Sequence, residues 1–269
     1  MRFGPAGYPS KGKTPEGSLQ YTKDLGLDAL EVEFVRGARI SPERAKAVGE
    51  FAKGLDIRMS CHAPYFISFN SDNPETREKS VGWVMDTVRA AHGLGAYIIV
   101  IHAASYGKSP DAALRSVTDG LSVCRDKMDD ENIKDVILGI ETMGKKSQFG
   151  TLNEISKVMD DIDGVRPVLD VAHVHARGVG VLTGREDMSS LVEEFFTLCG
   201  DIAHFHISGI KYGDKGEISH LPLSSKEPDM QMLADVLNDS KQDCTFICES
   251  PLIEEDAVLF RNMFPKYRK

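Results

Sequence analysis

Several apolar runs of the sequence end in a residue that can bind a metal or a proton. The run 136–143 carries Glu141 and the run 244–251 carries Glu249, although carboxylates are rarely buried without a partner. Histidine and aspartate occupy the same place in other runs. The whole set is His62, His102, Glu141, Asp170, His173, His206 and Glu249, with His220 in the loop after the run 202–209. Imidazoles and carboxylates without thiolates favour a borderline or hard divalent cation, so zinc, manganese or iron fits this set.

The segments that position these residues alternate between apolar and amphipathic character. The apolar segments, which we predict to be strands, are 2–7, 29–35, 57–65, 97–104, 136–143, 166–173, 202–209 and 244–251. The segments predicted to be helices are 15–26, 41–55, 74–95, 109–128, 151–162, 186–200, 228–240 and 254–264. Two helix starts are clear, because Ser41-Pro42-Glu43 and Asn73-Pro74-Glu75 combine a capping residue with proline.

This alternation predicts an α/β fold, a TIM (β/α)8 barrel with eight parallel strands. Helices that return the chain to the same end make successive strands parallel, and uninterrupted runs such as YIIVIHAA are typical of strands covered on both faces. A doubly wound open sheet is the alternative, but no glycine-rich phosphate fingerprint follows the first predicted strand. We therefore expect residues 1–269 to form a single barrel domain. The C-terminal ends of its strands would bring the metal-binding side chains to one mouth.

Composition limits the function classes. The five scattered cysteines fit free thiols in a reducing cytoplasm. No run approaches the roughly 20 apolar residues that cross a bilayer, and MRFGPAGYPS lacks the apolar core of a signal peptide. We therefore expect a cytoplasmic location. The net charge of −9 disfavours a nucleic-acid partner, although a small basic rim can accompany an acidic body.

Short motifs at the strand ends resemble those of the endonuclease IV family of apurinic/apyrimidinic (AP) endonucleases, in the xylose-isomerase-like group of TIM barrels. HAPY (62–65), LDVAH (169–173) and CESP (248–251) match the family's motifs after its third, sixth and eighth strands. IHAAS (101–105), IETM (140–143) and HIS (206–208) resemble the corresponding segments with substitutions. The motifs occur in the family's order, so the resemblance covers essentially the whole chain.

The resemblance implies two or three zinc ions. A first ion would be held by His62, His102 and Glu141. Glu141 would bridge to a second ion, which would also be held by Asp170, His206 and Glu249. A third would use His173 and His220, but Ile218 stands where the family has an aspartate. Either Glu217, Asp214 or His175 replaces this aspartate, or the third site is vacant or weak.

The function that the resemblance implies is metal-dependent hydrolysis of DNA phosphodiesters, 5′ to abasic sites, in DNA repair. Glu141 would orient or deprotonate the nucleophile, and Tyr65 would contact the substrate. A cluster of ions about 4 Å apart suits this chemistry, because it clamps both the attacking and the leaving oxygen.

The alternative is a sugar isomerase or epimerase of the same barrel group, which would act on a small sugar with one metal. That metal would be held by Glu141, Asp170, His206 and Glu249. Glu33 and the acidic net charge favour this function. His62 and His102 argue against it, because an isomerase with one metal does not need histidines at the ends of those two strands. A barrel that keeps a metal site only as a scaffold is the third interpretation. The number of ions per chain separates the first two.

Overall fold

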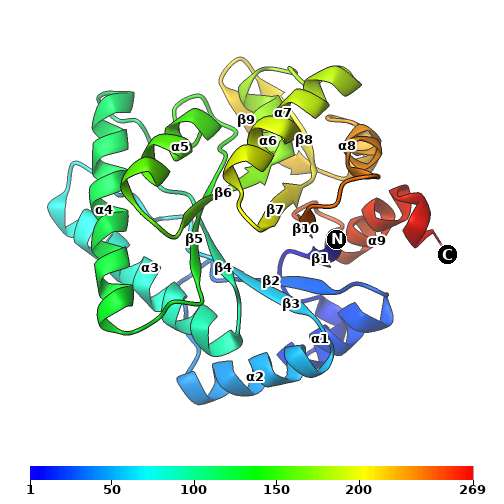
Figure 1. Cartoon of the computed structure of the whole chain (residues 1–269), viewed down its shortest axis with the longest axis horizontal. Coiled ribbons are helices and arrows are strands. Elements are labelled where there is room, and N and C mark those ends of the chain that lie inside the picture. The colour runs from blue at the N-terminus through cyan, green and yellow to red at the C-terminus, as the bar shows by residue number, and fades with distance from the viewer. Residues whose placement is uncertain (269) are drawn as a thin grey trace. The chain divides into compact units, whose positions relative to one another are not determined.

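The computed structural model of the chain describes residues 1–268 (Figure 1). Its large sheet consists of β1 (Arg2–Pro5), β2 (Ala29–Glu33), β3 (Arg58–His62), β4 (Ile98–Ile101), β5 (Ile137–Glu141), β6 (Val165–Asp170), β7 (Ile202–Ile207) and β10 (Asp243–Cys248). The helices are α1 (Pro15–Asp24), α2 (Pro42–Gly54), α3 (Pro74–Leu94), α4 (Pro110–Asp130), α5 (Leu152–Asp161), α6 (Val171–Arg177), α7 (Arg185–Leu198), α8 (Met230–Leu237) and α9 (Ile253–Met263). A hairpin of β8 (Gly209–Gly213) and β9 (Gly216–Leu221) forms a separate two-stranded sheet.

The eight-strand prediction for a TIM barrel is confirmed within residues 1–268. The strand order is β1-β10-β7-β6-β5-β4-β3-β2, and the pairings within the sheet, such as β4 with β5 and β7 with β10, are parallel. Every residue of β4 is buried, as its uninterrupted apolar sequence predicts.

The structure corrects the predicted ends of several strands. The predicted strand 166–173 stops at Asp170, because the Asp170 carboxylate accepts a hydrogen bond from the His173 backbone N–H and so caps α6. Segments 57–65, 97–104 and 136–143 also extend in the prediction beyond β3, β4 and β5. Neither α6 nor the β8–β9 hairpin is predicted from the sequence, because both are short and interrupt the strand–helix alternation.

The chain divides into two compact units. The first unit contains Met1–Leu30, Thr142–Lys146 and the chain from Val168 onward, and the second contains Glu31–Glu141 and Ser147–Pro167. The expectation that residues 1–269 form one domain stays a prediction.

Side-chain caps mark the start of several helices. Ser41 accepts a hydrogen bond from the Arg44 N–H, and Asn73 accepts one from the Glu75 N–H. Each of these caps precedes a proline in the first turn, as predicted. Among the helices of residues 1–268, none is both long and apolar enough to cross a membrane.

Aromatic side chains form the core of the first unit around β1, β10 and α9. Phe3 of β1 stacks on Phe246 of β10 with ring centroids 5.3 Å apart. Phe246 in turn contacts Phe205 of β7, Phe260 and Phe264. Figure 1 shows β1 beside β10 and close to α9. The first strand of the chain is therefore held by its last strand and last helix.

In the second unit, β3, β4 and β5 lie next to one another and α3 packs against α4 (Figure 1). His62 is the last residue of β3, His102 follows β4 directly, and Glu141 is the last residue of β5. Since the strands are parallel, all three side chains belong to the C-terminal edge of the sheet.

Replacing Glu154 by glutamine should destabilise the protein by about 1 kcal/mol near neutral pH, the usual cost of a lost cap. The Glu154 carboxylate accepts hydrogen bonds from the backbone and hydroxyl of Thr151 at 2.9 Å, closing a capping box at α5. Burial raises the pKa of Glu154, but hydrogen bonds from Thr151 and Tyr106 outweigh burial and hold the pKa below its ordinary value of 4.5.

Because this pKa is lowered on folding, the stabilisation is present above pH 4.5 and disappears as the pH falls through the lower, folded value. Urea unfolding of Glu154→Gln and wild type should therefore converge in acid. The matched control is Glu50→Gln, which changes an exposed glutamate of α2. An equal loss from both variants would contradict the role of the cap.

The native protein should react slowly with the thiol reagent DTNB, and all five cysteines should react after denaturation. Each cysteine is buried and lies outside any disulfide, and burial raises the pKa of Cys124, Cys244 and Cys248 to about 12. The thiolate, which is the reactive form, is therefore scarce in the folded state. Rapid labelling of even one thiol in the native protein would contradict this prediction.

Candidate metal centre

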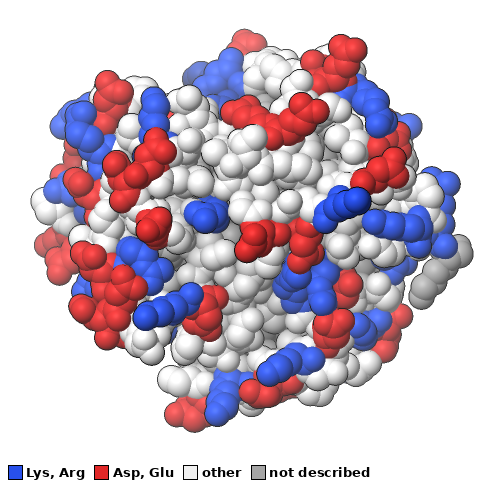
Figure 2. Space-filling model, viewed as in Figure 1, with Lys and Arg blue, Asp and Glu red and all other residues white. Residues whose placement is uncertain are grey.

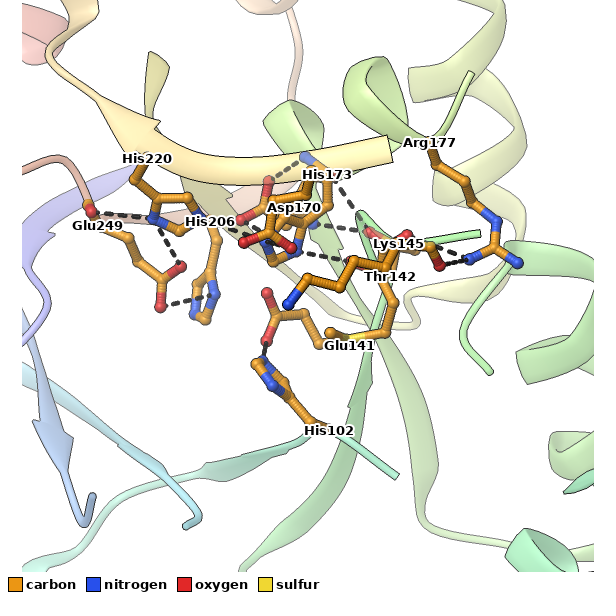
Figure 3. Close-up of polar contacts among 12 residues, drawn as sticks. His102, Glu141, Thr142, Lys145, Asp170, His173, Arg177, His206, His220 and Glu249 are labelled. Atoms are coloured by element: carbon orange, nitrogen blue, oxygen red, sulfur yellow. Dashed lines mark hydrogen bonds and ion pairs between the residues drawn. The ribbon is translucent and has the colours of Figure 1, made fainter. Parts of the chain in front are cut away.

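In the second unit, His62, His102 and Glu141 converge from three adjacent strands. The Glu141 Oε2 atom lies 2.6 Å from His102 Nε2 and 3.3 Å from His62 Nε2. Figure 3 shows His102 with its ring nitrogen turned to the Glu141 carboxylate. Glu141 and His62 are fully buried, and the His102 side chain is 17% exposed. One ligand atom from each residue lies within 4.8 Å of the others, an arrangement that suits one divalent cation.

The orientation of the His62 ring is fixed by a backbone carbonyl. His62 Nδ1 lies 2.7 Å from the Ala63 oxygen, which can only accept, so Nδ1 carries the proton and Nε2 faces Glu141. Metal-binding histidines typically donate their second ring N–H in this way. Burial lowers the pKa of His62, but the carboxylates of Glu33, Glu141 and Glu31 outweigh burial and raise this pKa to about 10. At neutral pH the metal-free ring therefore also carries a proton on Nε2, and a metal ion that binds this nitrogen would displace that proton.

In the first unit, Asp170 and His173 are set by the junction of β6 and α6. Asp170 ends β6, and its Oδ1 atom accepts the His173 N–H at 2.7 Å. The Asp-x-x-His motif is therefore a helix cap as well as a pair of candidate ligands. The backbone of Asp170 is fixed further by the Thr142 hydroxyl, which accepts the Asp170 N–H at 2.9 Å.

His173 and His220 face each other through their Nε2 atoms, 3.2 Å apart. His173 Nδ1 donates to the Thr142 carbonyl oxygen at 3.0 Å, and His220 Nδ1 donates to the Glu249 carbonyl oxygen at 3.1 Å. With both Nδ1 atoms protonated, neutral rings would direct two lone pairs at each other. A shared cation between the two nitrogens removes this repulsion. Asp170, His173 and His220 form one of the candidate metal groups in residues 1–268.

His206 and Glu249 extend this arrangement across the neighbouring strands. Asp170 of β6 pairs in register with His206 of β7, and Glu249 follows β10, the next strand along. His206 Nδ1 lies 3.4 Å from Glu249 Oε1, and His220 Nδ1 lies 3.8 Å from Glu249 Oε2. Figure 3 draws both of these contacts, which join His220, Glu249 and His206 in a chain. The bridging role expected of Glu141 stays a prediction.

Tyr65 contacts both histidines of the second unit. Its ring centroid lies 4.9 Å from that of His62 and 5.1 Å from that of His102. Its hydroxyl donates to Glu33 Oε2 at 3.1 Å, and the residue is 48% exposed. Glu31 is fully buried two residues earlier on β2. Glu31 is not among the residues predicted from the sequence, although its spacing from Glu33 puts both side chains on one face of the strand.

His175 and His92 have partners outside the candidate metal groups. His175 Nδ1 accepts the Leu182 N–H at 3.2 Å and its Nε2 lies 3.0 Å from Glu227, so both ring nitrogens are engaged away from the metal groups. His92, on the surface of α3, pairs with Asp135 at 2.7 Å. Sequence reasoning also missed Thr142, which orients His173 and Asp170. Its place directly after Glu141 was the available signal.

Charged side chains of both signs are interspersed on the face drawn in Figure 2. One cation has a clear structural role: Arg177 Nη1 donates to the Lys145 carbonyl oxygen at 2.6 Å, as Figure 3 shows. This bond anchors the segment Thr142–Lys146, which carries the carbonyl group that orients His173.

Sequence comparison relates the chain to proteins of two kinds. An uncharacterized protein of Methanocaldococcus jannaschii is 32% identical over 267 residues, covering 97% of this chain and 96% of that protein. A probable endonuclease 4 of Staphylococcus aureus is 26% identical over 219 residues, covering 77% of this chain and 70% of that protein.

Two solved structures share the fold. A D-tagatose 3-epimerase-like protein superposes with a TM-score of 0.75 at 19% identity, covering 99% of this chain and 97% of the other. Endonuclease IV from Thermus thermophilus superposes with a TM-score of 0.73 at 20% identity, covering 99% and 100%. Residues 19–262 match the xylose isomerase-like TIM barrel family. Since this match spans most of the sequence and agrees with the strand order, the chain belongs to the xylose isomerase-like TIM barrel family.

Proposed function

We propose that the protein is a divalent-metal-dependent hydrolase that cleaves DNA phosphodiesters 5′ to abasic sites. The observation that carries this proposal is the presence of histidine pairs in both units, His62 with His102 and His173 with His220. Each pair directs ring nitrogens at a carboxylate or at the other ring. An isomerase site with a single ion has no use for these four imidazoles, whereas a phosphodiesterase with several ions does.

The family membership and one named relative support the same choice. The enzymatic family includes endonucleases as well as epimerases, and the Staphylococcus aureus relative is named a probable endonuclease 4. We propose zinc as the bound ion, because imidazole nitrogens and carboxylate oxygens without thiolates are common zinc ligands. The substrate would be DNA, and the process DNA repair.

When bound, divalent ions would supply positive charge that stabilises the phosphate during attack and would make water a better nucleophile. The Glu141 carboxylate, held by His62 and His102, would orient or deprotonate the attacking water. Tyr65 offers a partly exposed ring and hydroxyl beside the same histidines, and would contact the substrate. The buried position of Glu141 keeps its carboxylate in one orientation, which favours proton transfer at a fixed point.

A metal-dependent sugar epimerase is the second candidate, and Glu33 favours it. The Glu33 carboxylate lies within hydrogen-bond distance of the exposed Tyr65 hydroxyl, and a second carboxylate, Glu31, shares its strand. Anionic groups repel a phosphodiester but suit proton transfer between neighbouring carbons of a neutral sugar. The two functions differ in the number of ions they need.

Zinc-loaded wild-type protein should retain two or more ions per chain after desalting. His102→Ala should lose about one ion, because it removes one of three ligands that converge in the second unit. Elemental analysis by plasma mass spectrometry measures both values. The control is His92→Ala, which removes an exposed histidine paired with Asp135 and should keep the wild-type count. A single ion in the wild type, unchanged in His102→Ala, would favour the epimerase.

Zinc- or manganese-loaded protein should nick a labelled duplex that contains one tetrahydrofuran abasic analogue, and should leave the intact duplex uncut. Glu141→Gln should reduce the rate by about 100-fold or more, the usual contribution of an acid–base group, whereas His92→Ala should match the wild type. Gel electrophoresis against size markers identifies the cleaved bond. Protein that holds two or more ions and still fails to nick this duplex would overturn the proposal.

A further inference from the structure

Lys145 lies on the short segment Thr142–Lys146, which passes beside the His173 ring. A Cβ atom built on Gly144 would lie 2.9 Å from His173 Cδ2, a distance that real Cβ atoms do not show. Glycine at this position therefore lets the backbone lie against the imidazole. Since Lys145 is the next residue, its side chain begins beside a candidate metal ligand.

Two sets of contacts hold the backbone of Lys145. Arg177 Nη1 donates to the Lys145 carbonyl oxygen at 2.6 Å. Lys145 also forms an antiparallel bridge with Gly216, and the Lys146 N–H donates to the Lys215 carbonyl oxygen at 3.2 Å. Gly216 has a positive φ of 93° and no side chain, so the loop and the β8–β9 hairpin can approach closely. The Lys145 side chain therefore starts from a fixed backbone.

The Lys145 side chain extends toward the candidate site. Figure 3 shows it running from the loop toward the cluster that contains Asp170 and His173, whereas Arg177 reaches the same loop from the other side. Lys145 is exposed, and within residues 1–268 its ammonium group forms no ion pair. Its positive charge is therefore available to a ligand that enters the site.

Carboxylates surround the His173 ring in this part of the first unit. Asp170 caps α6 and belongs to the same candidate metal group as His173. A β-bulge at Ile218 precedes the pairing of Glu217, whose Oε2 atom lies 3.5 Å from His173 Nε2. The chain as a whole has a net charge of −9. These negative charges would repel a phosphodiester, so a cation such as Lys145 is needed to offset them.

We propose that Lys145 binds the phosphate group of the substrate. Its ammonium group contacts a non-bridging oxygen of the phosphodiester and offsets the repulsion from Asp170 and Glu217. Lysine suits this task because it carries a compact charge at the end of a flexible four-carbon stem. The inference rests on the proposed function and deepens it, because it names a residue that favours a phosphate-bearing substrate over a neutral sugar.

Calorimetric titration of the zinc-loaded full chain with inorganic phosphate tests this contact without DNA and without an activity assay. Lys145→Gln should weaken phosphate binding by about 10-fold or more, the usual loss for a hydrogen bond to a charged group. Lys145→Arg keeps the positive charge and should retain most of the affinity. Circular dichroism of each variant separates the loss of the contact from misfolding.

The matched control is Lys146→Gln, which removes the same charge from the next exposed residue of the loop. Neighbouring side chains of an extended segment point to opposite sides, so Lys146 does not share the direction of Lys145. This control should bind phosphate within about twofold of the wild type, because exposed charges are screened by salt.

A salt series extends the test to DNA. Chelator-treated protein lacks the ions that the proposed cleavage needs, so fluorescence anisotropy of a labelled abasic duplex measures binding alone. The logarithm of the affinity should fall with the logarithm of the salt concentration, and the slope should be shallower by about 0.9 in Lys145→Gln, the contribution of one phosphate contact. Lys146→Gln should keep the wild-type slope.

The phosphate titration decides the inference separately from DNA cleavage. Equal phosphate affinity in the wild type and folded Lys145→Gln, an equal loss from both glutamine variants, or no phosphate binding by the wild type would overturn the inference. A chain that leaves abasic duplex intact, while only Lys145→Gln loses phosphate affinity, would refute the proposed function and keep the role of Lys145. A chain that nicks the duplex with unaltered phosphate binding in Lys145→Gln would do the reverse.

Discussion

Hydrogen bonds from histidine Nδ1 atoms to backbone carbonyl oxygens set the chemistry of the candidate site. His62 donates to Ala63, His173 to Thr142, and His220 to Glu249. Each bond fixes the tautomer and the rotation of the ring, so that Nε2 is the nitrogen presented to a neighbouring ligand. Without these bonds, the backbone would no longer fix which nitrogen of each ring carries the proton. The strand ends therefore bring the histidines together, and the backbone carbonyl oxygens decide which nitrogen of each ring can bind a metal.

Much of the barrel was predictable because strands buried on both faces leave a simple signal. The apolar run of β4 and the capped helix starts at Ser41 and Asn73 are local features that the fold preserves. Asp170 shows the limit of such reasoning, since its carboxylate ends β6 and starts α6 at the same residue. The sequence remains largely apolar on both sides of Asp170. Only the hydrogen bond from the His173 N–H to the Asp170 side chain shows that the strand ends and a helix begins there.

Some residues of the candidate site could be predicted from the local sequence, whereas others are recognised only from contacts between distant segments. Apolar runs in the sequence predict where four of the strands, β3, β5, β6 and β7, end. The sequence alone therefore named His62, Glu141, Asp170 and His206 as candidate ligands. The contact between Glu217 and His173 depends on the bulge at Ile218 and on the room beside Gly144, neither of which periodicity can show. The link between Tyr65 and Glu33 likewise joins two segments 32 residues apart and needed the structure.

The pairing of β1 with β10 has a consequence for how the protein is made. Phe3 stacks on Phe246, and Phe260 and Phe264 of the closing helix and its end cover the ring of Phe3. The segment that forms β1 leaves the ribosome long before β10 is synthesised. This apolar segment therefore has no pairing partner during most of translation. The closing of so long a loop slows folding and leaves the nascent segment open to chaperones or to aggregation. Truncation near the C-terminus would therefore disrupt the packing of the very first residues.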